Sequence, residues 1–202
     1  KGKNQTKANL MSERDKVIKA LEKEVKSADI NREYDYVFSG FSVEIAGNEV
    51  LRLAQIPGVK AVYPNVHYTA DVISAEEIST EDFSPAMMNS APFIGANGAW
   101  ETGFTGEGVT VAVIDTGVDY THPDLAHAFG EYKGYDFVDD DTDPQEYPGE
   151  YHGTHVSGTV AANGAIKGVA PDATLLGYRV LGPDGGSTED VVAGIERAVQ
   201  DG

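Results

Sequence analysis

The 202-residue sequence contains no cysteine, which excludes disulfide scaffolds, thiol nucleophiles and thiolate metal sites. It also has no apolar run that approaches the length of about 18 residues that a membrane-spanning helix needs. An integral helical membrane protein is therefore not expected. Hydrophobic residues make up 41% of the chain and charged residues 24%, as is typical of globular proteins. The composition therefore predicts a globular protein with a buried core.

Basic residues are scarce, and they are unevenly distributed. The formal net charge is −18, from 15 Lys and Arg against 33 Asp and Glu. Residues 1–70 hold 11 basic and 9 acidic side chains, whereas residues 71–202 hold 4 and 24. Such asymmetry indicates two units with different roles. An acidic unit repels nucleic acid and anionic membrane surfaces, so neither is expected as a partner.

The more basic N-terminal part has the pattern of a small α/β module. A helix is predicted to start near Ser12, and alternating side chains predict strands at 34–38 and 41–45. A short helix at 50–54 and a strand at 59–63 follow. The order helix, strand, strand, helix, strand is that of a split β-α-β motif without its first strand.

The acidic part has the pattern of a parallel α/β domain. Residues 71–90 are rich in Ser, Thr, Ala and acids and read as a linker. Nearly continuous apolar runs at 109–114 and 173–181 are typical of strands covered on both faces. Small residues at 152–162 predict a helix, and Ser187 opens another. Functional residues are expected at the carboxyl ends of the strands.

Asp115 stands at the end of the first of these buried strands, in VIDTGVDYTHPDL. A carboxylate there is poorly solvated and needs a hydrogen-bond donor, for which a histidine would serve. Alternatively, backbone N–H groups of a strand-to-loop turn donate these hydrogen bonds, and Asp115 then has only a structural role. Asp-Thr-Gly also occurs in aspartic proteases, where two carboxylates share a proton. Since the sequence has a single copy, that alternative would require a dimer.

His152 opens the segment HGTHVSGTVAANG, whose small residues allow a helix to begin tightly beneath the imidazole. His152 and His155 would lie on one face of that helix, so a metal pair is conceivable. The glutamate of an HExxH motif is absent, however, and no third ligand is evident. A metal site is therefore the weaker interpretation of these two histidines.

The two motifs VAVIDTGVDYTHPDL and HGTHVSGTVAA, in this order, resemble the signatures of the subtilisin-like serine proteases, or subtilases. IKGVAPDATLLGYRVLGPDGGS resembles the segment that follows them, and the likeness is greatest to the minor extracellular type of bacilli. The resemblance implies an α/β fold in which residues 91–202 are the N-terminal part of a parallel-sheet, subtilisin-like catalytic domain. It also implies that Asp115 is the triad aspartate and that His152 is the general base.

By the same resemblance, residues 1–70 are an inhibitor-type propeptide. Such a propeptide is a small α+β, ferredoxin-like domain that assists folding and caps the active site. Residues 71–90 would then contain the processing region. The implied partners are protein or peptide substrates and the chain's own propeptide in the active-site cleft. The implied location is extracellular.

Two further sets of site residues follow from the resemblance. Gly185, Gly186 and Ser187 align with the stretch that pairs with extended substrate as an added strand, although a Gly-rich turn is the alternative. An acidic loop matches the subtilase calcium pattern D-F-V-D-x-D-x-x-P-Q, although a solvated loop is equally expected. No catalytic cofactor is expected. The candidate calcium ligands are Asp136, Asp139, Asp141 and Gln145.

The nucleophile segment of the family, Gly-Thr-Ser followed by Met-Ala, does not occur in this sequence. We therefore expect the 202 residues alone to be inactive. The expected function is that of a secreted serine endopeptidase precursor with an Asp-His-Ser triad, of which this chain carries Asp and His. The alternative is an inert fragment or pseudoprotease whose propeptide-like domain inhibits or chaperones a protease.

Overall fold

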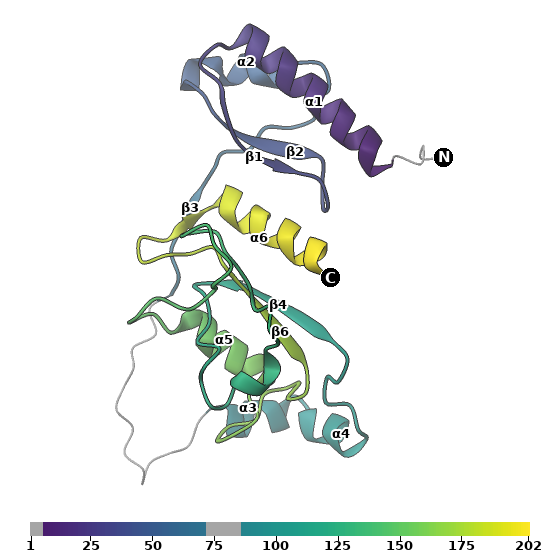
Figure 1. The fold of residues 1–202 in the computed structure, drawn as a ribbon, viewed down its shortest axis with the longest axis vertical. Helices are drawn as coiled ribbons and strands as arrows, with labels where there is room; N and C mark the ends of the chain where they lie inside the picture. Colours follow the sequence, from purple (N-terminus) through teal and green to yellow (C-terminus); the bar gives the residue numbers. More distant parts are fainter. Residues whose placement is uncertain (1–5, 72–85) are drawn as a thin grey trace. The chain divides into compact units, whose positions relative to one another are not determined.

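The computed structural model describes residues 6–71 and 86–202. These residues form two compact units (Figure 1). Unit 1 comprises the chain up to Val66 together with Ile195–Asp201, and unit 2 comprises His67–Gly194. Throughout the described ranges, every helix is too short or too polar to cross a lipid bilayer.

Unit 1 packs two helices over one face of an antiparallel hairpin (Figure 1). Its first helix begins at Lys7 rather than near Ser12 as predicted, because the side chain of Thr6 accepts a hydrogen bond from Asn9 N and caps it. Leu21 of this helix is fully buried in the unit's core. The elements are α1 (Lys7–Glu24), β1 (Asp29–Tyr34), β2 (Gly40–Glu44), a 3₁₀ turn (Gly47–Glu49) and α2 (Val50–Gln55).

Two predicted strands of unit 1 are wrong, one in its position and the other in its existence. The strand expected at 34–38 ends at Tyr34, because the four following N–H groups bind a side chain instead of a neighbouring strand. The strand expected at 59–63 is absent from the described structure. Val59 packs on the core of unit 1, but the segment forms no ladder with another strand.

Glu196 is the side chain that binds these four N–H groups. Its Oε2 accepts from Asp35 N at 2.8 Å and Tyr36 N at 2.5 Å, and its Oε1 accepts from Val37 N at 2.6 Å and Phe38 N at 3.3 Å. Burial opposes the charge of Glu196, but the four N–H donors outweigh it and lower the pKa of this carboxyl. The charged form therefore holds the 35–38 turn of unit 1.

The lowered pKa of Glu196 predicts a pH-dependent contribution to the stability of unit 1. Glu196→Gln should reduce the free energy of unfolding by about 1–3 kcal/mol at pH 7, because four backbone N–H groups lose a charged acceptor. A carboxyl with a lowered folded pKa stabilises above its unfolded pKa and loses this effect as the pH falls through the folded value. Urea titrations followed by the NMR signals of α1 should show the difference shrinking below about pH 4.

The exposed Glu22 of α1 provides the control, since Glu22→Gln removes the same charge without a buried bond. A difference between wild type and Glu196→Gln that stays constant from pH 7 to acid would contradict the assignment.

Unit 2 is built on a parallel sheet with strand order β4-β6-β5. Asp115 of β4 and Asp136 of β5 both lie opposite Arg179 of β6, so the carboxyl ends of the three strands meet. The helix that begins at His152 packs against β4 and β6. The elements are β3 (His67–Tyr68), α3 (Met87–Phe93), α4 (Ala96–Glu101), β4 (Thr110–Asp115), a 3₁₀ turn (Ala126–Ala128), β5 (Gly134–Asp136), α5 (His152–Ala161), β6 (Thr174–Arg179), β7 (Gly186–Ser187) and α6 (Thr188–Asp201), whose last turns belong to unit 1.

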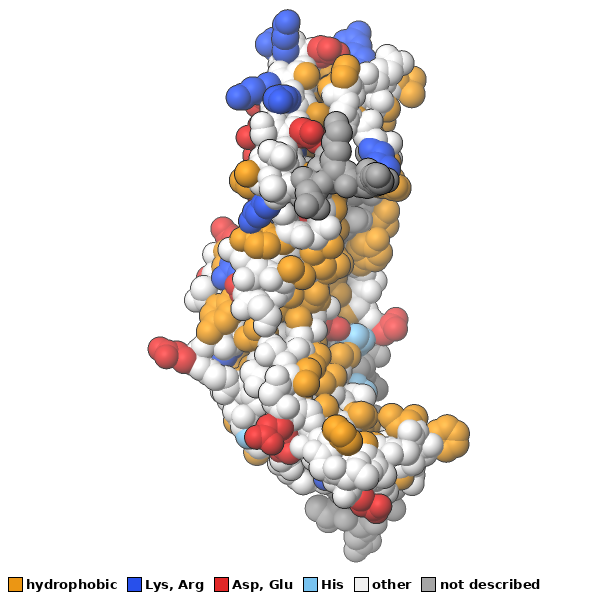
Figure 2. Space-filling view, turned by 90° about the vertical axis from the view of Figure 1, so that its right-hand side faces the viewer, with side chains coloured by type: hydrophobic (Ala, Val, Ile, Leu, Met, Phe, Trp, Pro, Cys, Tyr) orange, Lys and Arg blue, Asp and Glu red, His pale blue; other side chains and the backbone are white. Residues whose placement is uncertain are grey.

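The parallel sheet and the helices at 152–161 and 188–201 agree with the α/β pattern of the sequence. Ser187 caps α6 as expected: its Oγ accepts from Asp190 N at 3.4 Å and donates to Asp190 Oδ2 at 2.7 Å. The charge asymmetry is also visible on the surface. On the face drawn in Figure 2, most Lys and Arg side chains lie over unit 1.

Candidate active site

Asp115 and His152, predicted from separate motifs, lie within hydrogen-bond distance. The two atoms His152 Nδ1 and Asp115 Oδ1 are 2.7 Å apart, and Thr116 N donates to the same oxygen at 2.7 Å. The Asp115 side chain is 13% exposed and that of His152 is 28% exposed. With Nδ1 facing a carboxylate, that nitrogen is assigned the proton, and Nε2 is the nitrogen left to accept one. This is the arrangement of a histidine base oriented by an acid.

The metal interpretation of the histidine pair gains no support from the structure. His155 is exposed, whereas His152 faces Asp115. In residues 6–71 and 86–202, no group of three or more His, Cys, Asp or Glu side chains is arranged to hold a metal ion.

Two glycines allow the strand end and the helix start to meet. Gly117 has a φ of 103°, and a Cβ on it would lie 2.8 Å from Pro144 O. A Cβ on Gly153 would lie 1.9 Å from Gly117 O. Since no side chain tolerates these distances, Gly117 is required where the chain after β4 meets residues 144–146. Gly153 is required where the start of α5 meets the backbone of Gly117. That approach brings His152 to Asp115.

Gly153→Ala should therefore destabilise unit 2. We expect a loss of about 1–3 kcal/mol or more, because the new methyl group cannot avoid Gly117 O without a backbone shift. Trp100, the single tryptophan of the sequence, lies in unit 2 and makes denaturant unfolding measurable by fluorescence. Gly98→Ala is the control, since no atom lies within 4 Å of its added Cβ and it sits inside α4. Equal stability of wild type and Gly153→Ala would refute the packing argument.

The predicted substrate-pairing residues already have a strand beside them. β7 pairs antiparallel with β3, with Ser187 opposite His67 and Gly186 opposite Tyr68. Gly185 has a φ of 89°, and a Cβ on it would lie 2.1 Å from Tyr68 O. An extended segment of the chain therefore lies on residues 185–187 as an added strand, although their role with substrate stays a prediction.

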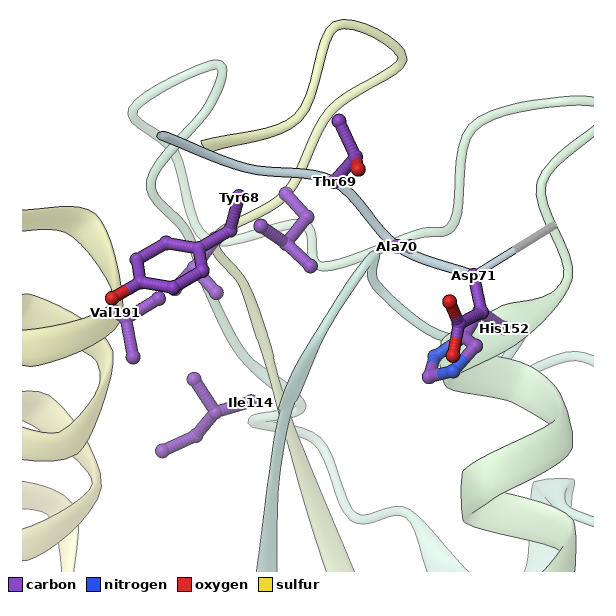
Figure 3. Close-up of a pocket in the computed structure, with 9 residues that line it drawn as sticks. Tyr68, Thr69, Ala70, Asp71, Ile114, His152 and Val191 are labelled. Carbon is purple, nitrogen blue, oxygen red and sulfur yellow. The ribbon is translucent and has the colours of Figure 1, made fainter. Parts of the chain in front are cut away.

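A pocket of about 460 Å³ links this strand to His152. Figure 3 shows the chain running from Tyr68 to Asp71, with Asp71 drawn at His152. Apolar side chains from β4, from the segment after β6 and from α6 form the rest of the lining, together with Tyr68. These apolar residues are Ile114, Val180, Leu181 and Val191.

The candidate calcium ligands do not converge on one point. Arg179 Nη1 binds Asp136 Oδ2 at 2.7 Å and Asp139 Oδ2 at 2.6 Å, so a guanidinium already neutralises this part of the loop. Burial opposes the charge of Arg179, but both carboxylates raise its pKa. Asp141 Oδ1 accepts from its own loop, at 2.8 Å from Asp143 N.

The fourth candidate, Gln145, forms a hydrogen bond with the side chain of Asp119. The loop as it stands does not fit a calcium cage. Calcium binding stays a prediction, which a calorimetric titration with Ca²⁺ would test.

A third carboxylate, Glu146, lies buried between the Asp115 and His152 motifs. It belongs to neither signature, so no motif of the sequence predicts its role. Its position directly after the acidic loop, and six residues before His152, carries no motif of its own.

Comparison with known proteins agrees with this geometry. Residues 106–202 match the model of the subtilase family, and residues 2–71 match that of peptidase inhibitor I9. The chain belongs to the subtilase family. Residues 2–71 are the inhibitor-type propeptide of such a protease, and residues 106–202 belong to the N-terminal part of a subtilase catalytic domain.

Individual relatives fall within the same family. The chain is 58% identical over 211 residues to the minor extracellular protease Vpr of Bacillus subtilis, covering 100% of this chain and 26% of that protein. It is 46% identical over 129 residues to halolysin of Haloferax mediterranei, covering 59% of this chain and 23% of that protein. With the major intracellular serine protease of Bacillus subtilis, it shares 45% identity over 108 residues, 50% of this chain and 33% of the relative. The subtilase thus spans a third or less of the length of these relatives.

Proposed function

We propose that this subtilase is the front part of a secreted serine endopeptidase precursor in which Asp115 and His152 are two members of an Asp-His-Ser triad. The observation that carries the proposal is the 2.7 Å distance between His152 Nδ1 and Asp115 Oδ1 at the carboxyl end of β4. The serine is proposed to lie outside these 202 residues. Extracellular action is proposed from the relative described as a minor extracellular protease.

In the proposed mechanism, His152 is the base and Asp115 orients it. Nε2 of His152 takes the proton from the serine hydroxyl as that oxygen attacks the peptide carbonyl, and later gives it to the leaving amine. Asp115 keeps the proton on Nδ1 and stabilises the imidazolium that forms. Its hydrogen bond from Thr116 N fixes the direction of this carboxylate.

Residues 185–187 are proposed to hold the substrate in an extended conformation. Main-chain hydrogen bonds along an added strand provide affinity with little dependence on side chains. The strand from His67 to Tyr68 occupies this edge in the present chain, and the pocket continues from Tyr68 to His152. The end of the propeptide is thus proposed to occupy the substrate's place until it is removed.

The alternative is a pseudoprotease or inert fragment whose unit 1 inhibits or chaperones a protease. The inhibitor I9 match of residues 2–71 fits this alternative as well as it fits a precursor. Only the precursor requires His152 for hydrolysis, so the two proposals differ in a measurable way.

His152→Ala in the full-length gene product should lower the hydrolysis of casein by about 10²–10⁴-fold, because the general base is lost. His155→Ala is the matched control: this exposed histidine lies on the same helix and should leave the rate unchanged. Cleavage that is equal in wild type and His152→Ala would refute the triad. A wild-type product that folds and cleaves nothing would favour the pseudoprotease.

A further inference from the structure

Glu146 connects the two motifs of the proposed catalytic pair. It is 5% exposed, and both of its carboxylate oxygens accept hydrogen bonds. Oε1 accepts from Gly153 N at 2.9 Å and from the hydroxyl of Thr116. Oε2 accepts from Thr154 N at 3.0 Å and from the hydroxyl of Thr154. One side chain thus binds the residue after Asp115 and the two residues after His152.

The backbone of Glu146 is held by the same loop that follows Asp115. Glu146 N donates to Val118 O at 3.3 Å, and Val118 N donates to Pro144 O at 2.9 Å. Pro144 and Val118 are fully buried. The carboxylate is therefore attached to a fixed backbone. It thereby fixes the start of α5 relative to the end of β4.

The start of α5 needs an acceptor of this kind. The first N–H groups of a helix have no partner within the helix, and a carboxylate there also interacts favourably with the helix dipole. Tyr151, which precedes the helix, provides no side-chain cap. Glu146 takes that role from six residues upstream, on the N–H groups of Gly153 and Thr154. Because His152 is the first residue of α5, the orientation of this helical turn determines where the imidazole lies.

We infer that Glu146 is a positioning residue that sets the His152 imidazole against Asp115. The inference rests on the proposed function of that pair. Charge-assisted bonds are about twice as strong as neutral ones, and a buried carboxylate with four donors leaves little rotational freedom. A glutamine would replace one oxygen by an NH₂ group, which would face N–H and O–H donors and could not accept from them.

Glu146→Gln is the test, and Glu150→Gln is its matched control. Glu150 lies in the same loop, and it interacts electrostatically with Asp115. Its Oε2 is buried without a hydrogen-bond partner, however, so the change removes a nearby carboxylate without breaking a bond to α5.

The first readout is the NMR signal of the His152 Nδ1 proton in the 202-residue chain. In Glu146→Gln we expect this signal to shift and its exchange with water to become about tenfold faster, while Glu150→Gln leaves both unchanged. The second readout is kinetic, in the full-length gene product. Glu146→Gln should lower kcat about 10- to 100-fold and leave KM within about twofold, because only the alignment of the base has changed.

A folded Glu146→Gln variant with an unchanged His152 signal would overturn the inference. If that variant fails to fold, Thr154→Val removes one donor to Glu146 and should move the same signal in the same direction by a smaller amount. An unchanged signal in folded Thr154→Val would then overturn it. A wild-type product without activity would contradict the proposed function alone, since the NMR readout does not depend on turnover.

Discussion

The close approach of Gly117 to Gly153 is the constraint on which the rest of the site depends. The end of β4 and the start of α5 are in backbone contact here, since a Cβ at Gly153 would lie 1.9 Å from Gly117 O. Once they touch, Asp115 reaches His152, and Thr116 Oγ1 accepts from Gly153 N at 2.9 Å. Each motif therefore consists of one functional side chain, Asp115 or His152, followed by small residues that let the two backbones approach.

The pairing of Asp115 with His152 could be predicted from the sequence because each motif indicates its own local structure. A β-rich apolar run that ends in Asp115 places a carboxylate at a strand end, and small residues after His152 place an imidazole at a helix start. The contacts that hold them could not be predicted in this way. Glu146 meets α5 only through the folded loop, and Glu196 meets the 35–38 turn across 158–161 positions of the sequence. Neither spacing has a period or a motif.

The acidic loop likewise contains a charged contact that could not be predicted from the sequence. The resemblance to the subtilase calcium pattern implies calcium ligands there, and that stays a prediction. The sequence does not show that the register of the sheet places Arg179 of β6 beside Asp136 of β5. That ion pair is almost fully buried on both sides, so its charges are compensated within the protein. Strand order, which decides such neighbours, is a property of the whole fold.

The proposed function requires a nucleophilic serine that Asp115 and His152 serve. Labelling of the full-length gene product with a fluorophosphonate tests it most directly, because this reagent reacts with a serine that a neighbouring base activates. We expect labelling of one serine in the wild type and its loss in His152→Ala, with the fold of the variant verified by NMR. A folded and processed wild-type product that takes up no label, or labelling that persists undiminished in His152→Ala, would contradict it.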